Sequence, residues 1–120
     1  MNVNRYRDLC ARPDVLRRGE LEETVSALRR LRSPDVPLVA EILEQPPIER
    51  PLIHSAGSEA DFFFVTVDTD VIESIVDQLF EAKAAAVPSG GEATPEATRL
   101  TELADLWTDC REYLENGGAA

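Results

Sequence analysis

The sequence predicts a helix-rich α+β fold, with N-terminal helices, a central β-hairpin and two long C-terminal helices. We expect one globular domain over residues 1–116 and a disordered tail at 117–120. Three observations support this prediction. Apolar residues recur every three or four positions over most of the chain, two short apolar runs replace that pattern in the middle, and 120 residues with 43% hydrophobic composition suffice for one core.

The N-terminal third predicts three helices. Helical spacing of apolar residues indicates a short helix over 3–10 and a second over 20–32, separated by a segment that contains Pro13 and Gly19. Ser33 is a natural N-cap and Pro34 fits the first helical position, so a third helix follows and ends before Pro46-Pro47. The second and third helices are therefore expected to pack as an antiparallel pair.

The middle of the chain predicts a hairpin whose strands are 51–54 and 62–67, joined by the turn-forming sequence "SAGSEAD". Strand alternation places Phe63, Val65 and Val67 on one face and Phe62, Phe64 and Thr66 on the other. Both faces begin with apolar residues. Phe62 and Phe64 therefore need cover, either from the N-terminal helices or from a second copy, and the small number of helices favours a homodimer.

The C-terminal half predicts the two long helices. The first runs from Asp70 to about Ala86 and begins with a capping box formed by Asp70 and Glu73. Its core stripe consists of Val71, Ile72, Ile75, Val76, Leu79 and Phe80. The second begins at Thr94-Pro95, ends near Gly117, and buries Leu100, Leu103, Trp107, Cys110 and Leu114.

An apolar strand runs into Asp68-Thr69-Asp70, and residues 62–71 resemble the first motif of haloacid-dehalogenase-type phosphatases. That resemblance implies a nucleophilic carboxylate, a second carboxylate as general acid, and a magnesium ion. The Gly of the motif is Val71 here, and the chain after it lacks the βα units that supply the remaining ligands. We therefore interpret Asp68 and Asp70 as a strand-to-helix junction rather than a catalytic site.

Other residue patterns also argue against an enzyme. His54 is the only histidine, and no nucleophile, phosphate-loop or cofactor motif accompanies it. The two cysteines, Cys10 and Cys110, lack the close spacing of metal ligands, so we expect no metal or cofactor. Buried thiols are the favoured interpretation of both cysteines, and a disulfide between the terminal helices is the alternative.

Charge distribution points to a class of partner. The net charge is −11, with a balance of +3 over residues 1–32 and −14 over residues 33–120. Such a chain repels phosphate backbones and suits a basic protein, although acidic surface is also a general device for solubility. The expected partner-binding residues are two acidic rows and two aromatics, namely Glu73, Asp77, Glu81, Glu102, Asp105, Asp109, Glu112, Phe62 and Phe64.

The sequence therefore predicts a small acidic, non-enzymatic interaction protein, such as an inhibitor, an immunity-type protein or an adaptor. Two alternatives stay open: a self-associating structural subunit, and a small enzyme that uses His54. No apolar run is long enough to span a bilayer, and the N-terminus has no signal-peptide h-region, so we expect a cytoplasmic protein that does not bind membranes.

Overall fold

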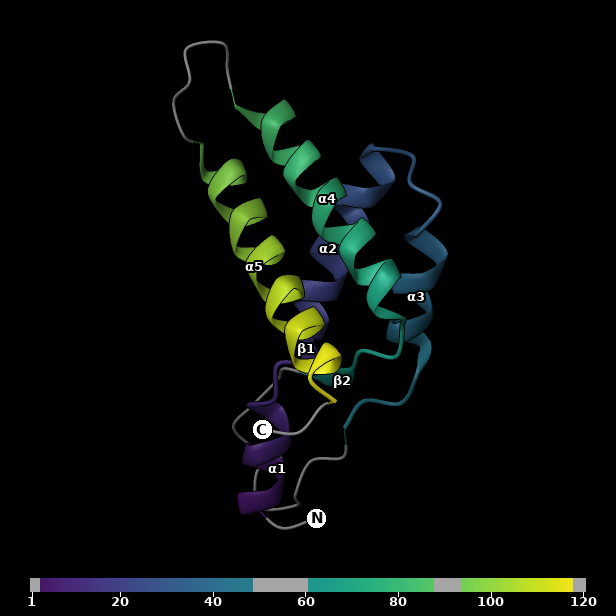
Figure 1. Ribbon diagram of the computed structural model, residues 1–120, viewed down its shortest axis with the longest axis vertical. Coiled ribbons are helices and arrows are strands. Elements are labelled where there is room, and N and C mark those ends of the chain that lie inside the picture. Colours follow the sequence, from purple (N-terminus) through teal and green to yellow (C-terminus); the bar gives the residue numbers. More distant parts are fainter. Residues whose placement is uncertain (1–2, 49–60, 88–93, 118–120) are drawn as a thin grey trace.

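A computed structural model describes residues 3–48, 61–87 and 94–117, in five helices and two strands. Their bounds are α1 Val3–Cys10, β1 Val15–Arg17, α2 Arg18–Arg30, α3 Val36–Glu44, β2 Phe62–Phe64, α4 Thr69–Ala86 and α5 Pro95–Glu115 (Figure 1). The predicted helix-rich α+β class, with two long C-terminal helices, is confirmed.

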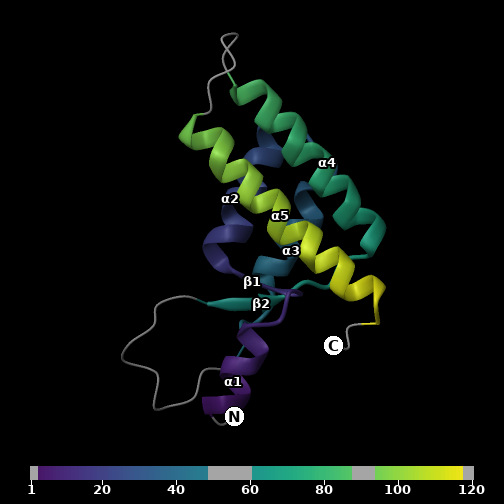
Figure 2. The ribbon, with the colours of Figure 1, turned by 60° about the vertical axis from the view of Figure 1, so that its left-hand side comes forward.

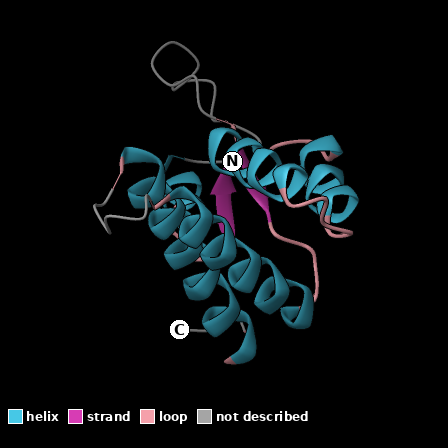
Figure 3. Ribbon diagram, turned by 90° about the horizontal axis from the view of Figure 1, so that it is seen from above, coloured by secondary structure: helices cyan, strands magenta, loops and turns pink. Residues whose placement is uncertain are grey.

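Helices α2, α3, α4 and α5 share one hydrophobic core, because each has apolar residues at the three- and four-residue spacing that makes a helix amphipathic. Trp107 is fully buried in this core. Its indole Nε1 donates a hydrogen bond to Thr24 Oγ1 at 3.0 Å, and the Thr24 hydroxyl donates to the Glu20 carbonyl at 2.8 Å. The buried indole N–H of Trp107 and the buried hydroxyl of Thr24 thus each have a hydrogen-bond partner. Figure 3 shows the helices and the two strands in a view from above.

The sheet lies between this core and α1, as Figure 2 shows. Strands β1 and β2 pair antiparallel, with Leu16 opposite Phe63 and Arg17 opposite Phe62. Leu16 and Phe63 belong to the main core. The other face belongs to a second cluster, in which Phe62 packs against Tyr6 of α1. This alternation follows from the two-residue period of a strand.

The strand that pairs with β2 differs from the expected one. The sequence predicts pairing with residues 51–54, which lie outside the described residues, whereas β2 pairs with β1. The segment that forms β1 was expected only to interrupt two helices. Backbone hydrogen bonds extend the pairing on both sides, from Val65 N to Asp14 O at 2.8 Å and from Arg18 N to Asp61 O at 2.9 Å. The strand ends at Phe64 rather than at residue 67.

Two expected N-caps are wrong. The N-cap of α3 is Asp35, and the Ser33 hydroxyl instead accepts a hydrogen bond from the Asp35 amide at 3.0 Å. The N-cap of α4 is Asp68, whose carbonyl accepts from the Ile72 amide at 3.0 Å. The helix therefore begins before Asp70, which lies in the first turn, and the expected capping box does not form. The strand-to-helix junction itself is present.

The ends of α5 agree with the prediction. The Thr94 hydroxyl accepts a hydrogen bond from the Ala97 amide at 3.0 Å, and Pro95 occupies the first turn. At the other end, Gly117 has a φ of 83°, a left-handed conformation that glycine adopts without steric strain.

Both cysteines are free thiols, so the alternative of a disulfide is not observed. Cys110 is fully buried in the main core, and this burial raises the pKa of its thiol to about 12. Cys10 is partly buried against the second cluster under the sheet, and its pKa is also raised, chiefly by burial. Neither thiol is poised for nucleophilic chemistry at neutral pH.

Candidate protein-interaction surface

The predicted acidic residues all lie on exposed faces of α4 and α5. Their helices turn the opposite faces, which include Ile75 and Trp107, into the core. Helices α4 and α5 run side by side (Figures 1 and 2), and all seven of these acidic residues are exposed. We call this set the acidic face; it consists of Glu73, Asp77 and Glu81 on α4, and Glu102, Asp105, Asp109 and Glu112 on α5.

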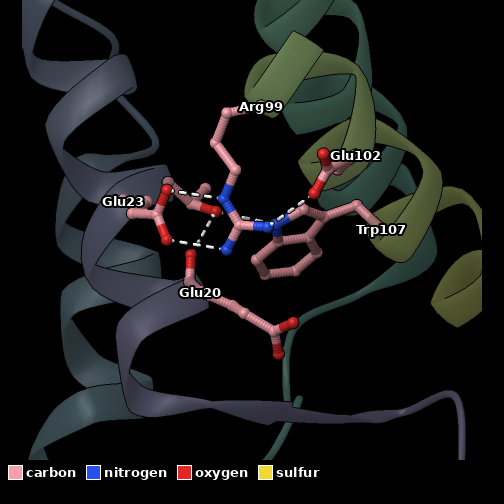
Figure 4. A network of polar contacts seen from close by, with 6 residues as sticks. Glu20, Glu23, Arg99, Glu102 and Trp107 are labelled. Atoms are coloured by element: carbon pink, nitrogen blue, oxygen red, sulfur yellow. Dashed lines mark hydrogen bonds and ion pairs between the residues drawn. The ribbon is translucent and has the colours of Figure 1, made fainter. Parts of the chain in front are cut away.

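Only one residue of the acidic face has an ion pair with another described residue. Arg99 donates to Glu102 through Nη1 at 3.0 Å. Arg99 also binds Glu23 of α2 through Nε and Nη2, both at 2.7 Å, so that it links α2 to α5 (Figure 4). These hydrogen bonds lower the pKa of the Glu23 carboxyl. Glu102 is therefore part of a contact that holds the fold together.

The other six carboxylates of the acidic face have no ion pair within the described part of the chain. Like charges four positions apart on a helix repel each other, and each such pair destabilises the helix by about 0.2–0.5 kcal/mol. On α4, both Glu73 and Glu81 lie four positions from Asp77. These carboxylates of α4 thus lower the stability of their own helix, and no ion pair with a described residue compensates for the repulsion.

Phe80 is a further residue of this surface, and the sequence-based prediction of its position is wrong. We expected Phe80 in the core stripe of α4, but 45% of its surface is exposed. It lies at the edge of the apolar stripe, one position after the fully buried Leu79 and one before Glu81. The apolar stripe of α4 is broader than the face that the neighbouring helices cover. This breadth is the signal in the sequence that could have indicated the exposure of Phe80.

The two predicted aromatic contacts have different environments. Phe62 is partly buried, and its ring meets that of Tyr6 edge-on with centroids 6.2 Å apart. Helix α1 therefore covers Phe62 within one chain. Phe64 is 37% exposed, with the guanidinium of Arg12 located 5.4 Å from its ring centroid. The same guanidinium binds the buried Asp14 through two hydrogen bonds of 2.8 and 2.9 Å.

A pocket of about 550 Å³ lies where the turn after α1 meets the last turns of α5. Its wall contains two cations, Arg12 and Arg17, together with Glu20 and with Asp109 and Glu112 of the acidic face. Because charges of both signs line it, the wall does not select one class of small ligand.

Among the described residues, no group of three or more His, Cys, Asp or Glu side chains is arranged to hold a metal ion. Asp68 and Asp70 are both exposed at the start of α4. His54, on which the enzyme alternative depends, lies outside the described residues. No described helix is long and apolar enough to cross a membrane.

Comparison of the chain with protein-family models, with curated proteins and with solved structures finds no match.

Proposed function

We propose that this chain is a small protein-binding domain, without enzymatic activity of its own, that docks on a basic partner through the acidic face. The observation that carries the proposal is the row of exposed carboxylates with no ion pair among the described residues. In a free protein these charges repel each other along α4 and α5. Against a basic surface the same charges attract the partner, accelerate association and exclude partners of the wrong sign.

The kind of partner follows from the sign and position of the charge. A net charge of −11 opposes binding to nucleic acid, whose phosphates would be repelled over most of the surface. Two free thiols also fit a reducing compartment, and we propose a cytoplasmic location.

The test compares two variants that change the net charge equally but on different surfaces. Asp105→Lys with Asp109→Lys reverses two charges of the acidic face. Glu41→Lys with Glu44→Lys reverses two exposed charges of α3. Once a partner has been identified by cross-linking in cells, we expect the first variant to slow association at least tenfold more than the second. If both variants slowed association equally, the acidic face would not be the docking surface, and its charges would serve only general solubility.

Self-association is a second candidate, and the exposure of Phe64 favours it. A dimer that covers this ring would bury an aromatic that α1 leaves in solvent. Analytical ultracentrifugation of the native protein tests this candidate, since a monomer at high concentration contradicts it. Two chains of charge −11 repel each other, so we expect any such dimer to strengthen as salt is added.

A further inference from the structure

Phe80 lies within the acidic row of α4. Glu73, Asp77, Phe80, Glu81 and Ala84 follow each other at spacings of four, three, one and three positions, and all five are exposed. Each of these residues lies three or four positions from another of the set, and such positions share one side of a helix. The exposed face of α4 therefore presents an aromatic ring beside a row of three carboxylates. On binding, such a ring can become a buried anchor while the charges form a polar rim.

We infer that the basic partner docks through an amphipathic segment, which places an apolar side chain on Phe80 and Lys or Arg side chains on Glu73, Asp77 and Glu81. This inference rests on the proposed function and names the chemistry of the partner at one part of the acidic face. The three carboxylates extend over eight positions, or about 12 Å along α4. A segment of roughly two helical turns has the length to meet all of them.

Other occupants fit this face less well. A purely apolar surface would remove three carboxylates from water without providing a counter-charge, which is strongly unfavourable. A polyanion is repelled by the same groups. A second copy of this chain carries −11 and presents the same acids. A basic segment without an apolar residue satisfies the carboxylates but leaves the ring of Phe80 in water, so the amphipathic segment is the occupant that matches both features.

The test uses two labelled synthetic peptides as probes. They have the same length and the same number of lysines, but one has leucines at helical spacing and the other has serines at those positions. Fluorescence anisotropy at low and at physiological salt measures the affinity of each for the intact chain. We expect the leucine peptide to bind about fivefold more tightly, which corresponds to ~1 kcal/mol from burial of the exposed part of Phe80.

Two variants assign that preference to a residue. Phe80→Ser should remove the preference for leucine and keep the salt-dependent binding, whereas Phe64→Ser, which changes the other exposed phenylalanine, should keep both. The fluorescence of the buried Trp107 verifies that each variant is folded, and Phe80→Ala repeats the test with a smaller change in polarity.

Each outcome decides the inference. Equal affinity of wild-type protein for the two peptides, or an unchanged leucine preference in folded Phe80→Ser, would overturn it. If both peptides bind equally and weaken with salt, the inference fails while the proposed function stands. If neither peptide binds even at low salt, both the inference and the proposed attraction of basic segments by this face are contradicted.

Discussion

Repulsion within the acidic face leads to a prediction about stability that needs no partner. Asp77 lies four positions from both Glu73 and Glu81, is exposed, and has no ion pair with a described residue. Asp77→Asn removes two like-charge pairs of about 0.2–0.5 kcal/mol each. The residue lies in the middle of α4, where the helix dipole has little effect, and Asp and Asn have similar helix propensities. We therefore expect the free energy of unfolding to rise by about 0.4–1 kcal/mol.

Urea denaturation followed by the fluorescence of Trp107, the single tryptophan, measures this change. The gain should be largest in dilute buffer and should shrink in ~1 M salt, where the Debye length is about 3 Å. Glu102→Gln is the matched control, because the carboxylate of Glu102 binds Arg99. Loss of the ion pair between Arg99 and Glu102 should lower the free energy of unfolding by roughly 0.2–1 kcal/mol. If Asp77→Asn were no more stable than wild type in dilute buffer, repulsion along α4 would be refuted.

Three further predictions follow from the core and the sheet. Thr24→Val should lower the free energy of unfolding by about 1–3 kcal/mol, measured in urea, because the buried indole N–H of Trp107 loses its acceptor. Burial raises the pKa of the Cys110 thiol to about 12, whereas the pKa of an unfolded thiol is near 8.5. The stability that the buried neutral thiol contributes is therefore fully present below pH ~8.5 and is lost as pH rises toward 12. Urea unfolding curves between these pH values should show a falling free energy of unfolding, and a constant value would contradict the prediction. Phe62→Ser should destabilise the monomer more than Phe64→Ser in thermal denaturation, since α1 covers only the former ring; equal losses would argue against that packing.

The long helices were predictable because their signal is local. In α2, α4 and α5 the side chains that reach the core recur with the helical period over three to six turns, so the pattern is visible without knowledge of the partner helices. The same period placed the acidic rows on the outside, and the structure shows them exposed. Helix starts were less accurate, as at Asp35 and Asp68, since several residues near each start can serve as a cap.

The features that were missed depend on distant parts of the chain. Strand β1 lies between Pro13 and Gly19 and has only three residues, so it is too short to show the alternation of a strand in the sequence. It forms a strand because it pairs with β2, which is far away in the chain. Arg99, which pairs with Glu102 in the same helix, also binds Glu23 of α2, and Glu23 is 76 positions from Arg99 in the sequence. Phe80 is exposed because the neighbouring helices cover only part of the apolar stripe of α4, and the sequence does not show how much they cover.

The way the sheet joins the molecule has a consequence for the order in which the chain folds. Helices α4 and α5 are neighbours in sequence, so their contacts close early and at small entropic expense, whereas the sheet requires segments such as Arg18 and Asp61, 43 positions apart, to meet. Helix α1 packs on the outer side of that sheet, away from the main core. We expect amide hydrogen exchange to show α1 and β1 opening together, more often than the helices of the core, as a separate unit of local unfolding.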